Sequence, residues 1–358
     1  MSVPGMAITP TAPTALRRLA APVGALLLGM LLATGCTQAA VDPPQDPDRT
    51  GPVLDREEQV LIAEDGYRLP YRRWGPEGDD GPKAVVLALH GMNDYSRGMR
   101  FAAERLAEHG IATYAYDQRG FGATRDAGLW PGDQALVDDA AAAVALLAEA
   151  YPDTPLHLLG HSMGGAVAMV LVTEQAPEAV SSVALLAPAV WGREAMPWYQ
   201  RSALWLTARA APGLELSGEL VGVEPTDNPE VLEEIATDPH IRRDVRADVL
   251  SGVADLMDRA LAASGELEAR ALILYGEHDE VIPPEPTCRM LARLPERPPG
   301  QWRLALYPEG YHMLTRDRNR DHVNDDLAAW FLDPAEAELP SGYEVDRAQA
   351  RAWLCSDP

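Results

Sequence analysis

The chain has 358 residues, 47% of them hydrophobic and 23% charged, a composition typical of a folded globular protein. Its formal net charge of −24 argues against sequence-independent nucleic-acid binding, which needs a basic surface, and against a polybasic membrane-binding patch. The length fits one large α/β domain with an insertion. The sequence contains no C-x-x-C, H-E-x-x-H or P-loop motif, so we expect no metal and no other cofactor.

The N-terminal segment predicts export. Arg17 and Arg18 precede an apolar run over 19–32, and the residues ATGC at 33–36 follow it. This order is typical of a signal peptide. The small residues before Cys36 are also similar to a bacterial lipobox, in which Cys36 would be lipidated and become the first residue of the mature protein.

The lipobox match has one departure, because Ala33 stands where that motif usually has a large aliphatic residue. Ordinary signal cleavage near Ala39 and a retained anchor are therefore alternatives, although the apolar run is short for a transmembrane helix. We expect 1–36 to be a signal peptide with a lipobox-like end and 37–54 to be a flexible, Pro- and Asp-rich tether. The protein would then be an exported, membrane-anchored lipoprotein, or alternatively periplasmic or secreted.

Cys288 and Cys355 are the remaining cysteines of the sequence. Export would place them in an oxidising compartment, where they could form a disulfide. Two unpaired thiols are an equal alternative, because sequence alone does not determine disulfide geometry.

From residue 55 onward, strand-like and helix-like segments alternate along the chain. After a hairpin around 64–66, the strand patterns are KAVVLALHG, IATYAYD, LHLLG, SVALLAP, ALILYGEHD and WRLALYPEGYH. The helical patterns are FAAERLAEHG, 134–150, the segment after Ser162, 287–294 and 319–331. This alternation predicts an α/β fold, a mostly parallel sheet with helices on both faces and ligands at the carboxyl ends of its strands.

The alternation stops over about 191–270, which predicts a helical cap inserted into a main domain spanning 55–333. One helical segment of this range carries an apolar stripe that includes Val249, Val253 and Leu256. The weakly patterned tail over 334–358 is expected to be a C-terminal extension.

The sequence GHSMGG suggests a nucleophile. Ser162 lies between a predicted strand and a predicted helix, flanked by Gly160 and Gly164, as a strand-turn-helix nucleophile elbow requires. Glycines are needed because a tight turn brings neighbouring backbone too close for a Cβ. A chance G-x-S-x-G match is the alternative, and the remaining site residues decide between the two interpretations.

Asp279 and His312 follow the two later strands in turn- and glycine-containing loops. The chain order Ser162, Asp279, His312 and their places just beyond strand ends predict a catalytic triad. The backbone N–H groups of Met163 and Met92 are the expected oxyanion donors. His90, beside Met92, is expected to fix its loop through hydrogen bonds.

Four blocks, LHGMNDYSRGMRFAAERLAEHGIATYAYDQRGFGATR, GHSMGG, GEHDEVIP and EGYHML, resemble the monoacylglycerol lipase and lysophospholipase family of α/β-hydrolases. The resemblance covers roughly 55–333. It implies the α/β-hydrolase fold with an inserted cap, Ser162 as nucleophile, Asp279 and His312 as its partners, and the two oxyanion donors named above. The export signal and the tail lie outside the family pattern.

The expected function is serine-dependent hydrolysis of monoacylglycerol-like or lysophospholipid esters through an acyl-enzyme, with water or an alcohol as acceptor. Trp191, Trp198, Tyr199 and Trp205 of the cap could line an acyl channel or form the core of the cap. We expect a small lipid ester as substrate, no nucleic acid, membrane association through the N-terminal lipid, and no obligate protein partner.

Two alternatives remain open at this point. An exported aminopeptidase would need cap carboxylates to bind a free amine, and Glu215, Glu219 and Glu224 are available, although a solvated acidic face explains them more simply. A non-catalytic surface lipoprotein with this fold would be expected to carry a broken triad, and this triad is intact.

Overall fold

The structure is a computed structural model that describes residues 51–76, 81–217, 223–296 and 301–355, all within one unit. The predicted signal peptide, its Cys36 and most of the tether lie outside these residues, so the predictions made for them are not tested. No helix among the described residues is long and apolar enough to cross a membrane.

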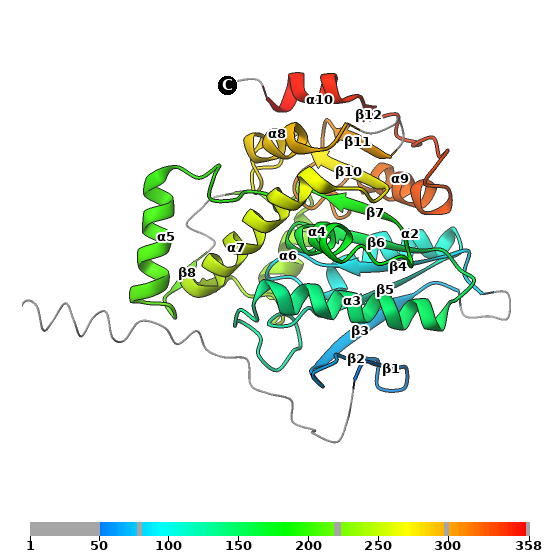
Figure 1. The fold of residues 1–358 in the computed structure, drawn as a ribbon, viewed down its shortest axis with the longest axis horizontal. Helices are drawn as coiled ribbons and strands as arrows, with labels where there is room; N and C mark the ends of the chain where they lie inside the picture. Colours follow the sequence, from blue (N-terminus) through cyan, green and yellow to red (C-terminus); the bar gives the residue numbers. More distant parts are fainter. Residues whose placement is uncertain (1–50, 77–80, 218–222, 297–300, 356–358) are drawn as a thin grey trace, which may run out of the picture. The chain divides into compact units, whose positions relative to one another are not determined.

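A ten-stranded sheet forms the centre of the fold, in the order β1-β2-β3-β5-β4-β6-β7-β10-β11-β12 (Figure 1). Its strands are β1 (Val53–Asp55), β2 (Val60–Ile62), β3 (Arg68–Trp74), β4 (Ala84–Leu89), β5 (Ile111–Tyr116), β6 (Leu156–His161), β7 (Val180–Leu186), β10 (Ala271–Gly276), β11 (Trp302–Tyr307) and β12 (Glu344–Val345). Neighbours from β5 to β11 pair in parallel, whereas the pairs at both edges are antiparallel. The predicted mainly parallel sheet is confirmed.

The helices either cover the two faces of the sheet or lie in the segment between β7 and β10. They are η1 (Ser96–Met99), α2 (Arg100–Glu108), α3 (Asp133–Ala150), α4 (Met163–Val170), η2 (Leu171–Gln175), α5 (Trp198–Ala210), α6 (Pro229–Thr237), α7 (Ala247–Ala263), η4 (Ser264–Glu266), α8 (Pro284–Arg293), α9 (Arg320–Leu332) and α10 (Arg347–Leu354).

The two faces bury separate apolar clusters, because successive side chains of a strand point to opposite sides. In β4, Val85, Leu87 and Leu89 belong to the cluster shared with α3, α4, α7, α8 and α10. Val86 and Ala88 belong to the other cluster, shared with α2 and α9. Both faces of a parallel strand are buried in this way, which explains the continuous apolar runs in the sequence.

The segment between β7 and β10 contains an exposed part and a buried part. The exposed part consists of helices α5 and α6 and a two-stranded antiparallel sheet of β8 (Glu215–Ser217) and β9 (Asp244–Arg246). Helix α7 instead packs on α4 and α3, and its apolar stripe, which includes Val253 and Leu256, joins the main core. We therefore propose that the cap ends before α7, whereas the sequence placed its end near residue 270.

The C-terminal segment adds to the main domain. Strand β12 pairs antiparallel with β11, and the buried Asp326 of α9 accepts hydrogen bonds from the backbone N–H and hydroxyl of Ser341. Helix α10 begins at a capping box formed by Asp346 and Gln349. These contacts hold part of the weakly patterned segment 334–358 against β11 and α9.

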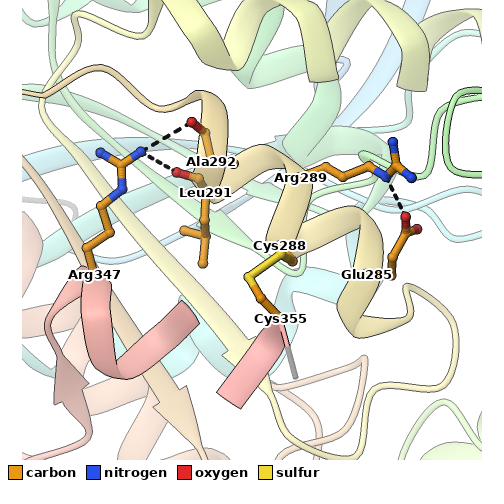
Figure 2. Close-up of a disulfide and its surroundings, with 7 residues drawn as sticks. All are labelled: Glu285, Cys288, Arg289, Leu291, Ala292, Arg347 and Cys355. Atoms are coloured by element: carbon orange, nitrogen blue, oxygen red, sulfur yellow. Dashed lines mark hydrogen bonds and ion pairs between the residues drawn. A yellow bond between two sulfur atoms is a disulfide. The ribbon is translucent and has the colours of Figure 1, made fainter. Parts of the chain in front are cut away.

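A disulfide between Cys288 of α8 and Cys355, which follows α10, joins these two helices (Figure 2). Beside it, the guanidinium of Arg347 donates hydrogen bonds to the carbonyls of Leu291 and Ala292 at the C-terminal end of α8. Arg347 also donates a hydrogen bond to the carbonyl of Leu294, directly after α8. The orphan carbonyls of that helix end are therefore satisfied by a cation, which the helix dipole also favours.

Replacing both Cys288 and Cys355 by serine is expected to lower the free energy of unfolding by up to about 4 kcal/mol, because the bond closes a long loop in the unfolded chain. The sequence separation is 67 residues. Urea unfolding of the oxidised protein and of the double variant measures the difference. The reduced wild-type protein should match the variant, and equal midpoints for the oxidised wild type and the variant would contradict the expectation.

Candidate active site

Ser162 lies at the junction of β6 and α4, in a strained turn. It has φ 52° and ψ −116°, outside the conformations that side-chain-bearing residues usually adopt. Its N–H donates to the carbonyl of Leu186 on the neighbouring strand, and its carbonyl accepts from Ala166 in α4. Such strain costs about 1–3 kcal/mol and is characteristic of functional turns.

The glycines on either side are required by close backbone approach. A Cβ on Gly160 would lie 2.5 Å from the carbonyl oxygen of Gly164, and one on Gly164 would lie 2.2 Å from that of Leu89. No side chain fits at either position. The elbow geometry predicted from GHSMGG is therefore present in the structure.

Asp279 and His312 contact each other. Both are buried, and Oδ2 of Asp279 lies 2.9 Å from Nδ1 of His312. The other carboxylate oxygen, Oδ1, accepts the backbone N–H groups of Val281 and Ile282, each at 2.9 Å. Because the carboxylate accepts at Nδ1, the proton of the neutral imidazole lies there and the lone pair lies on Nε2.

The loops that follow β4, β6 and β11 meet around Ser162. The ring of His161 lies 4.9 Å from the ring of His312, and its Nε2 is 3.0 Å from the His312 carbonyl oxygen. A Cβ on Gly91 would lie 3.3 Å from the Cβ of Ser162, so the loop after β4 passes beside the serine. The three predicted triad residues thus lie on neighbouring loops at one edge of the sheet.

His161, within the elbow, contacts His312, and this contact was not among the sequence predictions. Burial, together with the nearby His312, lowers the pKa of His161 to about 3. His161 is therefore neutral, and its Nε2–H donates to the His312 carbonyl. No spacing in the sequence indicates this contact.

The expected oxyanion donors flank the serine. Met163 is the first residue of α4, a position whose N–H has no partner within the helix. Met92 follows Gly91 in the loop after β4, and Asn93, with φ 61°, turns the chain directly after it. These positions suit both predicted donors, whose role stays a prediction.

His90 fixes the loop that carries Met92, as the sequence predicted. Its Nε2 accepts the N–H of Gln118 at 2.9 Å, so Nδ1 carries the proton and donates to the carbonyl of Gly91 at 2.8 Å. Burial lowers the pKa of His90, which keeps the ring neutral.

The aromatic residues of α5 are exposed. No residue of this helix is buried, and Trp198 is 76% exposed, with Tyr199, Trp205 and Leu206 also largely exposed. These side chains are not a cap core, so that alternative was wrong for them. In the part of the chain that the structure describes, no group of His, Cys, Asp or Glu could hold a metal ion.

Comparison with known proteins extends these observations. The model of the serine aminopeptidase S33 family matches residues 80–319. A monoacylglycerol lipase of Mycolicibacterium smegmatis is 26% identical over 282 residues, which cover 77% of this chain and 97% of that protein. The monoglyceride lipase of Homo sapiens is 27% identical over 263 residues, covering 72% and 84%.

Solved structures share the fold. A soluble variant of monoglyceride lipase from Saccharomyces cerevisiae, in complex with a substrate analog, has a TM-score of 0.64 at 20% identity and covers 83% of this chain and 100% of its own. A monoacylglycerol lipase of Paleococcus ferrophilus has a TM-score of 0.61 at 22% identity, covering 74% and 99%. The α/β-hydrolase fold and the resemblance to monoacylglycerol lipases are confirmed. The chain belongs to the serine aminopeptidase S33 family, and it is a serine hydrolase.

Proposed function

We propose that this hydrolase cleaves carboxylic esters of lipids, of the monoacylglycerol or lysophospholipid type, through an acyl-enzyme on Ser162. The observation that carries the proposal is the buried, hydrogen-bonded pair of His312 and Asp279, on the loops after β11 and β10, together with a strained elbow serine. A nucleophile, a base and a group that orients the base are thus available on adjacent loops.

In the proposed mechanism, Nε2 of His312 takes the proton of Ser162 while Oγ attacks the ester carbonyl carbon. Asp279 holds the imidazole through Nδ1–H and stabilises its charged form. The backbone N–H groups of Met92 and Met163 bind the oxyanion. The imidazolium then protonates the departing alcohol, and a water molecule, deprotonated by the same histidine, releases the fatty acid and restores Ser162. A second alcohol in place of water would give acyl transfer.

Two observations support a lipid ester as substrate. The relatives with the matches described above are named monoacylglycerol or monoglyceride lipases. Helix α5 also exposes large apolar side chains, among them Trp198 and Trp205, which suit contact with an acyl chain or a lipid phase. The net charge of −24 makes strongly anionic substrates less favourable.

Hydrolysis of 4-nitrophenyl esters of increasing chain length, and of monoacylglycerol, by the protein without residues 1–36 tests the substrate class. We expect turnover of longer-chain esters and of monoacylglycerol, because an apolar site binds a longer chain more tightly. An aminoacyl anilide is included as the alternative substrate. Turnover of short esters alone would contradict the lipid-ester assignment.

An aminopeptidase is the second candidate, favoured by the description of the matching family. Of the carboxylates expected to bind an amine, Glu215 is exposed and accepts a hydrogen bond from Arg242, and Glu219 lies outside the described residues. The backbone N–H of Glu224 donates to Glu280. Cleavage of the anilide without cleavage of esters would select this candidate, and absence of any turnover would favour a non-catalytic role.

Export and lipidation at Cys36 remain predictions from the sequence. A lipid anchor would hold the enzyme next to lipid esters, which agrees with the proposed substrate class.

A further inference from the structure

A buried ion pair connects the two loops that flank Ser162. Nη1 of Arg316 lies 2.9 Å from Oδ2 of Asp94, and the two residues are 5% and 7% exposed. Asp94 belongs to the loop after β4, hereafter the β4 loop (residues 90–95). Arg316 belongs to the loop after β11, hereafter the β11 loop (residues 308–319), which carries His312. Their separation of 222 residues shows that the pair forms only in the folded chain.

On the β4 loop, Asp94 closes the turn that contains Met92. Its N–H donates to the carbonyl of Gly91 at 3.3 Å, so the Met92 peptide lies inside a turn that ends at Asp94. The carboxylate is seated against Gly98, where a Cβ would lie 2.1 Å from Oδ2. The position of the Asp94 side chain is therefore tightly restricted, and with it the turn.

On the β11 loop, Arg316 closes a second turn, which begins directly after His312. Its N–H donates to the carbonyl of Met313 at 2.7 Å, and Asp317 donates to the same carbonyl at 3.1 Å. Asp317 also accepts the N–H of Tyr311 at 2.8 Å. The residues before and after His312 are thus both held by Arg316 and its neighbour.

The cap segment that precedes α6 binds the same loop. The N–H of Met313 donates to the carbonyl of Pro225 at 2.9 Å, and the side chain of Asn228 donates to the Arg316 carbonyl at 2.9 Å. The hydroxyl of Thr226 donates to Asp317 at 2.6 Å. The β11 loop is therefore fastened to the β4 loop on one side and to the cap on the other.

We propose that Asp94 and Arg316 are positioning residues. Their ion pair holds the Met92 N–H and the His312 side chain at fixed positions relative to each other, on either side of Ser162. The inference rests on the proposed function, because it assigns the pair a role in aligning the oxyanion donor with the base. Neither residue takes part in bond making. A tie between two loops matters for catalysis because a misplacement of about 1 Å between donor and base can cost 10²-fold in rate.

The test compares Asp94→Asn, Arg316→Met, the double variant and Arg316→Lys with the wild type, using a 4-nitrophenyl ester. We expect kcat of Arg316→Met to fall about 10- to 100-fold with little change in KM, because alignment affects the transition state more than binding. The double variant should lose no more kcat than either single variant, because each of the three variants removes the same ion pair. Arg316→Lys keeps the charge and should recover part of kcat.

The control is a second buried pair, Arg119 with Asp139, whose Nη2 and Oδ1 atoms are 2.7 Å apart. Asp139 belongs to α3 and Arg119 to the loop after β5, where Arg119 also binds Asp65, so the pair lies outside the β4 and β11 loops. The double variant Arg119→Met/Asp139→Asn should lose thermal stability and keep kcat per folded molecule. Removing both members of a pair avoids leaving a buried unpaired charge, so both double variants are expected to fold.

Three outcomes would overturn the inference: wild-type kcat in the folded Asp94→Asn/Arg316→Met variant, a loss that only follows its folded fraction, or an equal loss in the control pair. Ser162→Ala is measured alongside. If that variant kept its activity, the proposed function would fail; if it were inactive while the Asp94 and Arg316 variants kept wild-type kcat, only the positioning role would fail.

Discussion

Replacing Ser162 by alanine is expected to lower kcat by at least about 10³-fold and to leave the fold intact. The substitution removes Oγ, the proposed nucleophile, and nothing else. The turn should survive, because the hydrogen bonds of residue 162 to Leu186 and Ala166 are made by its backbone and alanine keeps the Cβ. The loss is therefore chemical rather than structural.

Ester turnover by the purified variant, together with its thermal unfolding midpoint, measures both halves of this expectation. Ser182→Ala is the matched control, because Ser182 is also buried and its hydroxyl lies 2.8 Å from Nδ1 of His157 in the core. That control should lose stability and keep kcat. Activity retained by Ser162→Ala would exclude Ser162 as nucleophile.

The substitution Asp279→Asn is expected to lower kcat by about 10⁴-fold, the second large effect. The structure determines which way the new amide would face. Because Val281 and Ile282 both donate to Oδ1, the amide oxygen stays at that position and the NH₂ group replaces Oδ2 beside His312. An NH₂ donor there forces Nδ1 to accept and moves the ring proton to Nε2, so His312 can no longer take the serine proton.

Steady-state kinetics of Asp279→Asn, with KM determined separately, tests this prediction. KM should change little, since the carboxylate does not contact the substrate in the proposed mechanism. Asp326→Asn is the control for loss of a buried carboxylate, because Asp326 binds Tyr307 and Ser341 beneath α9, away from the site. A drop in kcat shared by both variants would contradict the orienting role of Asp279.

The parts of this fold that were predictable from sequence are those in which local pattern and burial agree. Continuous apolar runs such as that of β4 identified the buried strands, since a parallel strand covered on both faces needs apolar residues throughout. The place of α7 was not predictable in the same way. Its apolar stripe, with Val253 and Leu256, would look the same whether it packed in a cap or, as it does, on α4.

In the candidate site, too, the features with a local cause were predictable and those formed by distant residues were not. GHSMGG has a local reason, because Gly160 and Gly164 are required by backbone contacts within the turn and with β4. The ion pair of Asp94 with Arg316 has no local sequence signal. Each charged residue alone is typical of a protein surface, and only folding brings the two together. Strand β12 was also missed, since a two-residue edge strand is too short to show an alternating pattern.

The disulfide has a topological consequence. Cys288 and Cys355 close a covalent ring that contains β11, the β11 loop with His312, α9 and β12, whereas Ser162 and Asp279 lie outside it. A single peptide-bond cut within the ring would leave both fragments joined, so the base would stay tethered to the helix that follows the Asp279 loop. In the oxidising compartment that the predicted export would provide, His312 would therefore have a covalent path to the rest of the proposed site that does not depend on an unbroken backbone.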